Sequence, residues 1–291
     1  MDPTIRIPES MLPNLDNIEG SAPAVPRPAA TVVLLRDGRP GVEAHMLRRA
    51  GSMAFAADHL VFPGGGIDRS DQSAVRRWSG PPPEEWATLL DTDVDDARSI
   101  VTAAVRETFE ECGVLLADGP GGTPITRVGG DQWELEREAI ADHRMSLAEL
   151  FDRHELTLRS DLLQPWSLWV TPEFEPRRYH TWFMAARLPI GQEATPGASE
   201  AVSNEWYAIE DALRACDAGT LPMLPPQYCT LLELHGFNSV ESIFTAERQV
   251  PTVRPALGRD ADGGYLILPD RLVELGLRIG AQMYRDNEEQ R

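Results

Sequence analysis

The chain has 291 residues, of which 42% are hydrophobic, so it can bury a sizeable core. Its formal charge of −19 weighs against a nucleic acid or an anionic membrane as partner, because both would repel it. No apolar run approaches the roughly 20 residues that a membrane helix needs. These numbers favour a globular protein, with no nucleic acid and no membrane as partner.

The cysteines and the first residues indicate a compartment. The three cysteines are odd in number and widely spaced, with no C-x-x-C pair, so free thiols in a reducing cytoplasm are expected. Residues 1–28 contain six prolines and no basic region followed by an apolar stretch. We expect a Pro-rich arm rather than a signal peptide, in a cytoplasmic protein. If the arm is structural instead, a strand-exchanged homodimer is the alternative.

From Ala29 onwards, short apolar runs bounded by turn residues predict strands. The predicted strands are 30–35, 42–47, 60–62, 166–170, 181–186, a short one opened by Trp206, and 265–268. The strongest predicted helix runs from Asp95 to Cys112 and is closed by Gly113. Further helices are expected at about 132–159 and 222–247.

Two segments are typical of additions to a domain. Residues 72–94 combine a proline run with an acidic stretch, which indicates an insertion rather than a core element. The charged helices at 132–159 indicate a cap. We expect both to be peripheral and to shape the mouth of a site. The predicted organisation is an arm at 1–28, a main domain at 29–214, and a C-terminal helical extension with a short strand at 215–291.

The predicted helix from Asp95 to Cys112 has two chemically different faces. Glu107, Glu110 and Glu111 fall within an arc of roughly 100°. The opposite face is apolar and carries Val101, Val105, Phe109 and Cys112. Clustered carboxylates repel one another, and a hard divalent cation would remove that repulsion. A solvated acidic face is the alternative.

A glycine turn stands upstream of this helix. Phe62 to Asp68 reads FPGGGID, a strand that runs into three glycines. Glycine lets the backbone approach a ligand closely and offer carbonyls or amides to a metal or a phosphate. Strand, glycine turn and three-glutamate helix together favour a metal and phosphate site over a solvated face.

Residues 106–114, RETFEECGV, resemble the second half of the Nudix box. In that box a glycine, five residues, a glutamate and seven residues precede R-E-U-x-E-E-x-G-U, where U is bulky and apolar. Thr108 departs from the first U, and Asp71, which follows Gly65 after five residues, stands where the box has glutamate. Between Asp71 and Arg106 lie 34 residues, so the box is split.

A split box is similar to that of a Nudix subgroup which includes peroxisomal coenzyme A diphosphatases, and the resemblance covers roughly residues 30–250. It implies an α/β fold, the α/β/α Nudix sandwich with a mixed sheet. It also implies a hydrolase that depends on Mg²⁺ or Mn²⁺ and cleaves a diphosphate linkage. The implied substrate is a small-molecule nucleoside diphosphate derivative, such as coenzyme A or an acyl-CoA.

The resemblance also assigns roles to residues of the box. It implies that Glu107, Glu110 and Glu111 ligate the metal, with the carbonyl of Gly65 as a further ligand. Arg106 would orient the glutamates through charge-assisted hydrogen bonds.

Outside the box, Glu200 is our candidate for a further metal ligand or general base, and Glu205 is its rival. Three arginines near strand ends are candidate substrate-phosphate ligands, with a surface or structural role as the alternative. They are Arg48, Arg49 and Arg178.

Two other functions stay open. Asp71, Thr108 and the interruption leave room for a Nudix-like nucleotide sensor without turnover. The second alternative is a structural or interaction protein whose long acidic insertion binds a partner. The retention of Arg106 and of all three glutamates favours the enzyme, because a pure binder has no need of clustered like charge.

Overall fold

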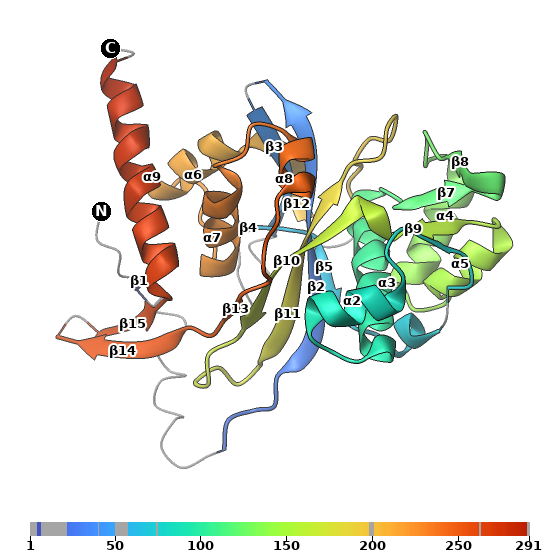
Figure 1. Cartoon of the computed structure of the whole chain (residues 1–291), viewed down its shortest axis with the longest axis horizontal. Helices are drawn as coiled ribbons and strands as arrows, with labels where there is room; N and C mark the ends of the chain where they lie inside the picture. The colour runs from blue at the N-terminus through green and yellow to red at the C-terminus, as the bar shows by residue number, and fades with distance from the viewer. Residues whose placement is uncertain are drawn as a thin grey trace.

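A mixed β-sheet forms the centre of the structure (Figure 1). The computed structural model describes residues 5–6, 22–39, 41–49, 58–73, 75–197, 201–261 and 263–289. The central strands are β2 (Arg27–Gly38), β3 (Gly41–Arg49), β4 (Leu60–Val61), β5 (Gly64–Gly66), β10 (Leu163–Val170), β11 (Tyr179–Arg187), β12 (Ala201–Ala208) and β13 (Thr252–Val253). Their order is β12-β3-β2-β11-β10-β13, with β4 beside β3 and β5 beside β2.

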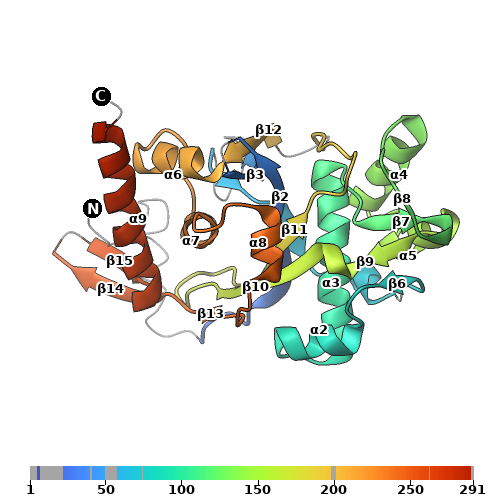
Figure 2. The ribbon, with the colours of Figure 1, turned by 45° about the horizontal axis from the view of Figure 1, so that its top comes forward.

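Helices cover both faces of this sheet (Figures 1 and 2). One group comprises α2 (Pro83–Leu90), α3 (Val94–Cys112), α4 (Asp131–Ala141) and α5 (Leu147–Arg153). The other comprises α6 (Ile209–Asp217), α7 (Pro225–Leu234), α8 (Val240–Thr245) and α9 (Asp270–Glu289). Each group encloses its own buried apolar cluster against the sheet. The three layers are the α/β/α order that the resemblance implies.

Two small sheets lie outside the central one. The first runs in the order β6 (Trp78–Ser79), β9 (Thr157–Arg159), β7 (Ala117–Gly119) and β8 (Thr123–Pro124). The second runs in the order β1 (Ile5–Arg6), β15 (Gly263–Ile267) and β14 (Ala256–Asp260). The first sheet therefore joins the expected insertion to the expected cap, and the second joins part of the N-terminal arm to the C-terminal extension.

Strand β2 positions the glycine turn. Its side chains alternate between the two apolar clusters, with Val32 on the α3 side and Val33 on the α7 side, and both are fully buried. The first half of β2 pairs with β5, where Ala30 stands opposite Gly65. The second half pairs with β3. The glycine turn is thus held against the strand on which α3 packs.

Local signals explain where α3 begins and ends. Asp93 is the N-cap, and its side chain accepts from the backbone N–H of Asp96 at 2.9 Å. Gly113 ends the helix in the left-handed region at φ 64°. The four apolar residues of the predicted core face are all fully buried, namely Val101, Val105, Phe109 and Cys112. The prediction of this helix and of its buried face is confirmed.

The expectation that residues 72–94 are peripheral is wrong for α2. Trp86, Ala87 and Leu90 lie on one face of this helix and belong to the same buried cluster as α3. The helix begins at Pro83, a first-turn position that proline tolerates because its missing N–H would have no partner there. The proline run that suggested a loop is in fact a helix start.

The other predicted limits also shift. Residues 132–159 form α4 and α5 as expected and then β9, but Ile140 and Phe151 are buried in the α3-side cluster, so this cap is part of the core.

Strand β2 begins at Arg27, two residues inside the expected arm. The expected boundary at 214 falls within α6, which packs on the sheet. Trp206 lies near the end of β12 rather than at its start.

The expectations about membrane helices and cysteines can be compared with the described parts of the chain. No helix there combines the length and the apolar character that crossing a membrane requires. Cys112 and Cys229 are buried free thiols, and Cys216 is half-buried and free, which agrees with the expectation of unpaired cysteines.

The buried face of α2 yields a test of the insertion. Trp86 is only 1% exposed, so Trp86→Ala should lower the free energy of unfolding by about 3–5 kcal/mol. Leu89→Ala on the same helix is the control, because Leu89 is 39% exposed and should change little. Urea denaturation followed by tryptophan-independent far-UV CD measures both. Equal, small effects would restore the view that the insertion is peripheral.

Candidate active site

The glycine turn and the glutamates of α3 meet in space. The backbone N–H of Gly64 donates to Glu111 Oε2 at 2.9 Å. A Cβ atom at Gly65 would overlap the carboxylate of Glu107, so only glycine permits this approach. Three glutamates and the glycine turn predicted from the sequence therefore form one site.

Arg106 is the centre of a buried hydrogen-bond network. Its Nε and Nη2 atoms donate to the two carboxylate oxygens of Asp71 at 2.8 and 3.1 Å. Its Nη1 donates to Glu107 Oε1 at 2.8 Å and to Glu110 Oε1 at 3.1 Å, and Nη2 also donates to the carbonyl of Gly66 at 2.9 Å. Such charge-assisted bonds are stronger than neutral ones, so Arg106 can orient two of the three glutamates.

Asp71 closes the split box. It lies in a short 3₁₀ helix, η3 (Arg69–Gln72), whose N-cap is Asp68. The two caps are reciprocal, because Asp68 accepts from the N–H of Ser70 at 3.1 Å and Asp71 accepts from the N–H of Asp68 at 2.7 Å. This turn fixes Asp71 where it can bind Arg106 in a bidentate manner. The shorter side chain at this box position thus still reaches its partner across the 34-residue interruption.

The site carries more negative than positive charge. The carboxylates of Asp71, Glu107 and Glu110 bind the guanidinium of Arg106, and the half-buried carboxylate of Glu111 adds a fourth negative charge beside Gly64. Burial raises the pKa of Glu107 to about 7, although Arg106 acts in the opposite direction. Burial likewise raises the pKa of Glu110 above its ordinary value. A further cation would relieve this excess of negative charge.

The donor set fits a hard divalent cation. Among the described residues, no three His, Cys, Asp or Glu side chains already stand as a metal-binding cluster, because two of the glutamates turn towards Arg106 and the third towards Gly64. Their chemistry, carboxylate oxygens beside a backbone carbonyl, is nonetheless the one that Mg²⁺ and Mn²⁺ prefer. Glu107, Glu110 and Glu111 could hold such an ion after side-chain rotation.

Arg48 and Glu205 lie on the other face of the sheet. Glu205 stands opposite Met46 in the β12–β3 ladder, and Met46 belongs to the α7-side cluster. Arg48 shares that face by alternation and stands opposite Leu60, which is in the same cluster. Neither side chain faces α3, so the structure does not bring Arg48 or Glu205 to the glutamate site, and their candidate roles stay predictions.

The remaining candidates have different positions. Arg178 donates from Nε to the carbonyl of Thr171 at 3.0 Å and from Nη1 to that of Ala24 at 2.8 Å, so it anchors the chain that enters β2. Arg49 follows Arg48 and therefore points to the α3 side of β3. Glu200 lies outside the described residues, and its role stays a prediction.

Arg137 is a site residue that the sequence did not single out. It lies on α4, and its Nε donates to the carbonyl of Glu110 at 2.9 Å while Nη2 donates to the carbonyl of Thr195 at 3.0 Å. Thr195 and Gly197 in turn donate their N–H groups to the carbonyls of Cys112 and Glu111. These bonds satisfy the last carbonyls of α3, which lack partners within the helix. In the sequence, Arg137 is one of many charges on a charged helix.

Asp68 and His143 form a second contact that the sequence did not signal. His143 lies in the turn between α4 and α5, and its Nδ1 is 2.9 Å from Asp68 Oδ2. Arg106 and, to a smaller extent, His143 oppose the rise that burial causes in the pKa of Glu110. His143 is therefore within electrostatic reach of the glutamate cluster. The partners are far apart in the chain, so no local motif could reveal them.

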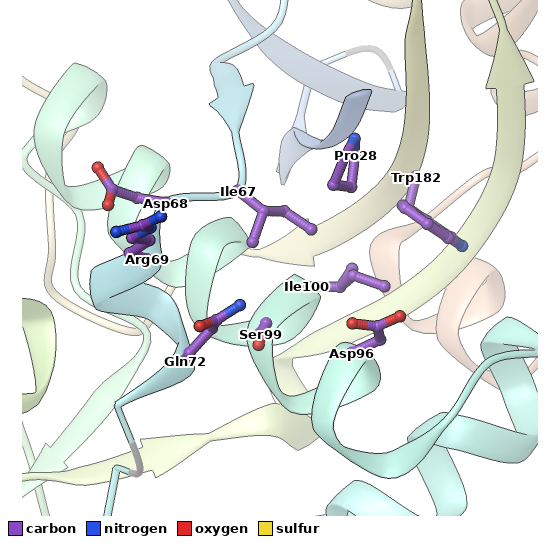
Figure 3. A pocket seen from close by; sticks show the side chains of 9 residues that line it. All are labelled: Pro28, Ile67, Asp68, Arg69, Gln72, Asp96, Ser99, Ile100 and Trp182. Carbon is purple, nitrogen blue, oxygen red and sulfur yellow. The ribbon is translucent and has the colours of Figure 1, made fainter. Parts of the chain in front are cut away.

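A pocket of about 150 Å³ opens beside the same turn (Figure 3). Its lining residues are Pro28, Ile67, Asp68, Arg69, Gln72, Asp96, Ser99, Ile100 and Trp182. The inner wall is apolar, whereas the carboxylate of Asp68 points away from the other lining side chains. A cavity of this size accepts about one six-membered ring.

Comparisons with known proteins agree with this geometry. The family model of the NUDT19 Nudix domain matches residues 83–234, just over half of the chain. The acyl-coenzyme A diphosphatase NUDT19 of Homo sapiens is 26% identical over 269 residues, which span 77% of this chain and 70% of that protein. The protein of the same name from Gallus gallus is 26% identical over 303 residues, spanning 82% and 78%.

A solved structure is also similar. The crystal structure of a NUDIX hydrolase from Alicyclobacillus acidocaldarius matches with a TM-score of 0.68 and 27% identity. The match covers 77% of this chain and 97% of that one.

The buried pair of Asp71 and Arg106 should dominate local stability. Asp71→Asn removes the charge that Arg106 binds with two hydrogen bonds, and a buried ion left short of its partner costs about 3–5 kcal/mol. The control is Asp152→Asn, because Asp152 forms an exposed ion pair with Arg76 and should cost at most about 1 kcal/mol. Urea denaturation at neutral pH compares them. Equal losses would mean that the Arg106 network does not hold the turn.

The raised pKa of Glu107 predicts a pH dependence of the metal-free protein. Its pKa is about 7 when folded against 4.5 as the ordinary value, so the folded state binds the proton more tightly. Its contribution therefore lowers stability progressively as pH rises from about 4.5 to 7, by roughly 3 kcal/mol in total. Urea denaturation in EDTA across this range should show that loss in the parent and not in Glu107→Gln. Parallel pH profiles of the two proteins would contradict the assignment.

Proposed function

The chain belongs to the NUDT19 Nudix domain family, and from that membership we propose that it hydrolyses coenzyme A or an acyl-coenzyme A at the diphosphate linkage. Nudix hydrolases of this kind cleave diphosphate linkages with the help of a divalent metal ion, and the chain is an enzyme of that class. The names of the human and chicken relatives support the choice of acyl-coenzyme A as substrate class.

One observation carries the proposal. The split box closes in space through the bidentate pair of Arg106 and Asp71, so the guanidinium that holds Glu107 and Glu110 is itself fixed across the interruption. Thr108 also fits, because it is fully buried and its hydroxyl donates to the carbonyl of Ala104 at 2.7 Å. The three features that left room for a sensor without turnover, namely Asp71, the interruption and Thr108, are thus all accommodated.

We assign the metal to Glu107, Glu110, Glu111 and the carbonyl of Gly65, with Mg²⁺ or Mn²⁺ as the expected ions because all four ligands are oxygen donors. When bound, such an ion stabilises the negative charge that develops on the phosphoryl oxygens. Arg106 holds the first two glutamates and the N–H of Gly64 holds the third.

The proposal extends to the base and to the outer phosphate contacts. Glu200 is the proposed general base, because it follows the segment from Thr195 to Gly197, which is bonded to the C-terminal carbonyls of α3. Arg49 is the proposed phosphate ligand among the three arginines, since its side chain points to the α3 side of β3.

The double variant Glu110→Gln, Glu111→Gln tests the metal assignment. It keeps the shape of both side chains and removes two charges, so kcat should fall by roughly 10²–10³. The melting temperature should stay the same or rise, because like-charge repulsion on α3 is relieved. Release of products from coenzyme A, acyl-coenzyme A, NADH and dinucleoside polyphosphates with Mg²⁺ or Mn²⁺ measures activity.

The control is Glu138→Gln on α4, because Glu138 is exposed to solvent. It should keep full activity. Full turnover by the double variant would end the metal-site assignment. No turnover of any substrate by the parent protein would instead favour the sensor.

A further inference from the structure

The guanidinium of Arg106, the positive charge at the centre of the buried network, has no donor free to bind the substrate. A guanidinium has five N–H donors, and those of Arg106 make five bonds, to Asp71 twice and once each to Glu107, Glu110 and Gly66. Arg106 therefore holds protein groups and cannot also bind a diphosphate. In a chain with a net charge of −19, the phosphates need donors from outside this network, in addition to the proposed contact with Arg49.

We propose that His143, held by Asp68, is a substrate-phosphate ligand that the turn between α4 and α5 contributes to this site. The inference rests on the proposed function and adds a residue outside the box. Phosphate binding is through Nε2, which donates a hydrogen bond to the phosphate when both ring nitrogens carry a proton. Asp68 is the positioning residue.

The first support is the fixed position of Asp68. It is the third residue after Gly65, and its Oδ1 accepts from the N–H of Ser70, which locks its rotamer. Its Oδ2 lies 2.9 Å from Nδ1 of His143. This contact leaves Nε2 as the outer atom of the ring, and no partner of Nε2 occurs among the parts of the chain that the structure describes. The side chain of His143 is 67% exposed, so a ligand can reach it.

The second support is the backbone at His143. Its φ is 55°, in the left-handed region that glycine adopts freely and other residues adopt with strain. The turn follows α4, with the N–H of His143 donating to the carbonyl of Ile140 at 2.8 Å. Gly113 occupies the equivalent position after α3. The same conformation occurs at Asp91, so the turn by itself does not mark a site, but it places the side chain of His143 beside Asp68.

The third support is the set of charges around the ring. Asp68 faces it from the glycine turn, Glu110 and Arg106 lie on α3, and Asp142 and Arg144 pair with each other in its own turn. The pKa of Asp68 lies below its ordinary value, chiefly through the N–H of Ser70 and also through the positive charge of His143. The ring is thus paired with Asp68 on one side and open to solvent on the other.

The key variant is His143→Gly. Glycine suits the left-handed turn, so the melting temperature should stay the same or rise, while KM for the substrate should increase about tenfold and kcat should change less. Added imidazole should restore part of the lost affinity, because a free imidazolium can occupy the space of the missing ring. A purely structural role would give no rescue. Asp68→Asn should raise KM to a smaller extent, because the ring loses the carboxylate that positions it.

The matched control is Asp91→Gly. Asp91 ends α2 in the same left-handed conformation, with φ 52°, but it has no place in the site. This variant should gain the same backbone freedom and leave KM unchanged. If His143→Gly and Asp91→Gly behave alike in KM, the inference is wrong.

A binding measurement separates this inference from the proposed function. Adenosine diphosphate with Mg²⁺ serves as a probe in calorimetry with the full-length parent and with His143→Gly. Binding weakened about tenfold in the variant supports the ligand role even if the parent turns over no coenzyme A. Equal binding overturns the ligand role even if the parent is fully active.

Discussion

The bonds of the Arg106 guanidinium hold together elements that lie far apart in the sequence. Its five donors join α3 to the glycine turn through Gly66 and to the 3₁₀ turn through Asp71, and they aim two glutamates of the site. A buried cation of this kind is tolerated only when its donors are satisfied. The position of the glycine turn, the burial of Glu107 and the closure of the split box therefore all depend on it.

The interruption of the box has its own structural solution. The cost of closing a loop grows slowly with its length, and part of the inserted chain folds into α2, which buries Trp86 beside α3. The insertion therefore contributes to the core of the domain that it interrupts. Asp71 precedes the inserted chain and Arg106 follows it, and the two residues consequently form their bidentate contact across the interruption.

The sequence predicted what depends on local pattern. The limits of α3, its apolar face and the glutamate cluster follow from helical periodicity and from residues such as Gly113. It could not tell which sheet face Arg48 and Glu205 occupy, because that depends on the register of β3 with β12. Arg137 could not be identified either, since the sequence around an arginine on a charged helix does not indicate its tertiary partners. The helix α2 was hidden because proline at a helix start resembles proline in a loop.

The parallel pair of β6 and β9 has a consequence for how this enzyme can diversify. Trp78 and Ser79 of the insertion pair with Leu158 and Arg159, which follow the cap helices. The two segments share one small sheet, so they form a single exchangeable unit. A recombinant that inherited one segment without the other would carry an unpaired strand edge. Natural variation in this part of the molecule should therefore be correlated, with the insertion and the cap changing together while α3 stays constant.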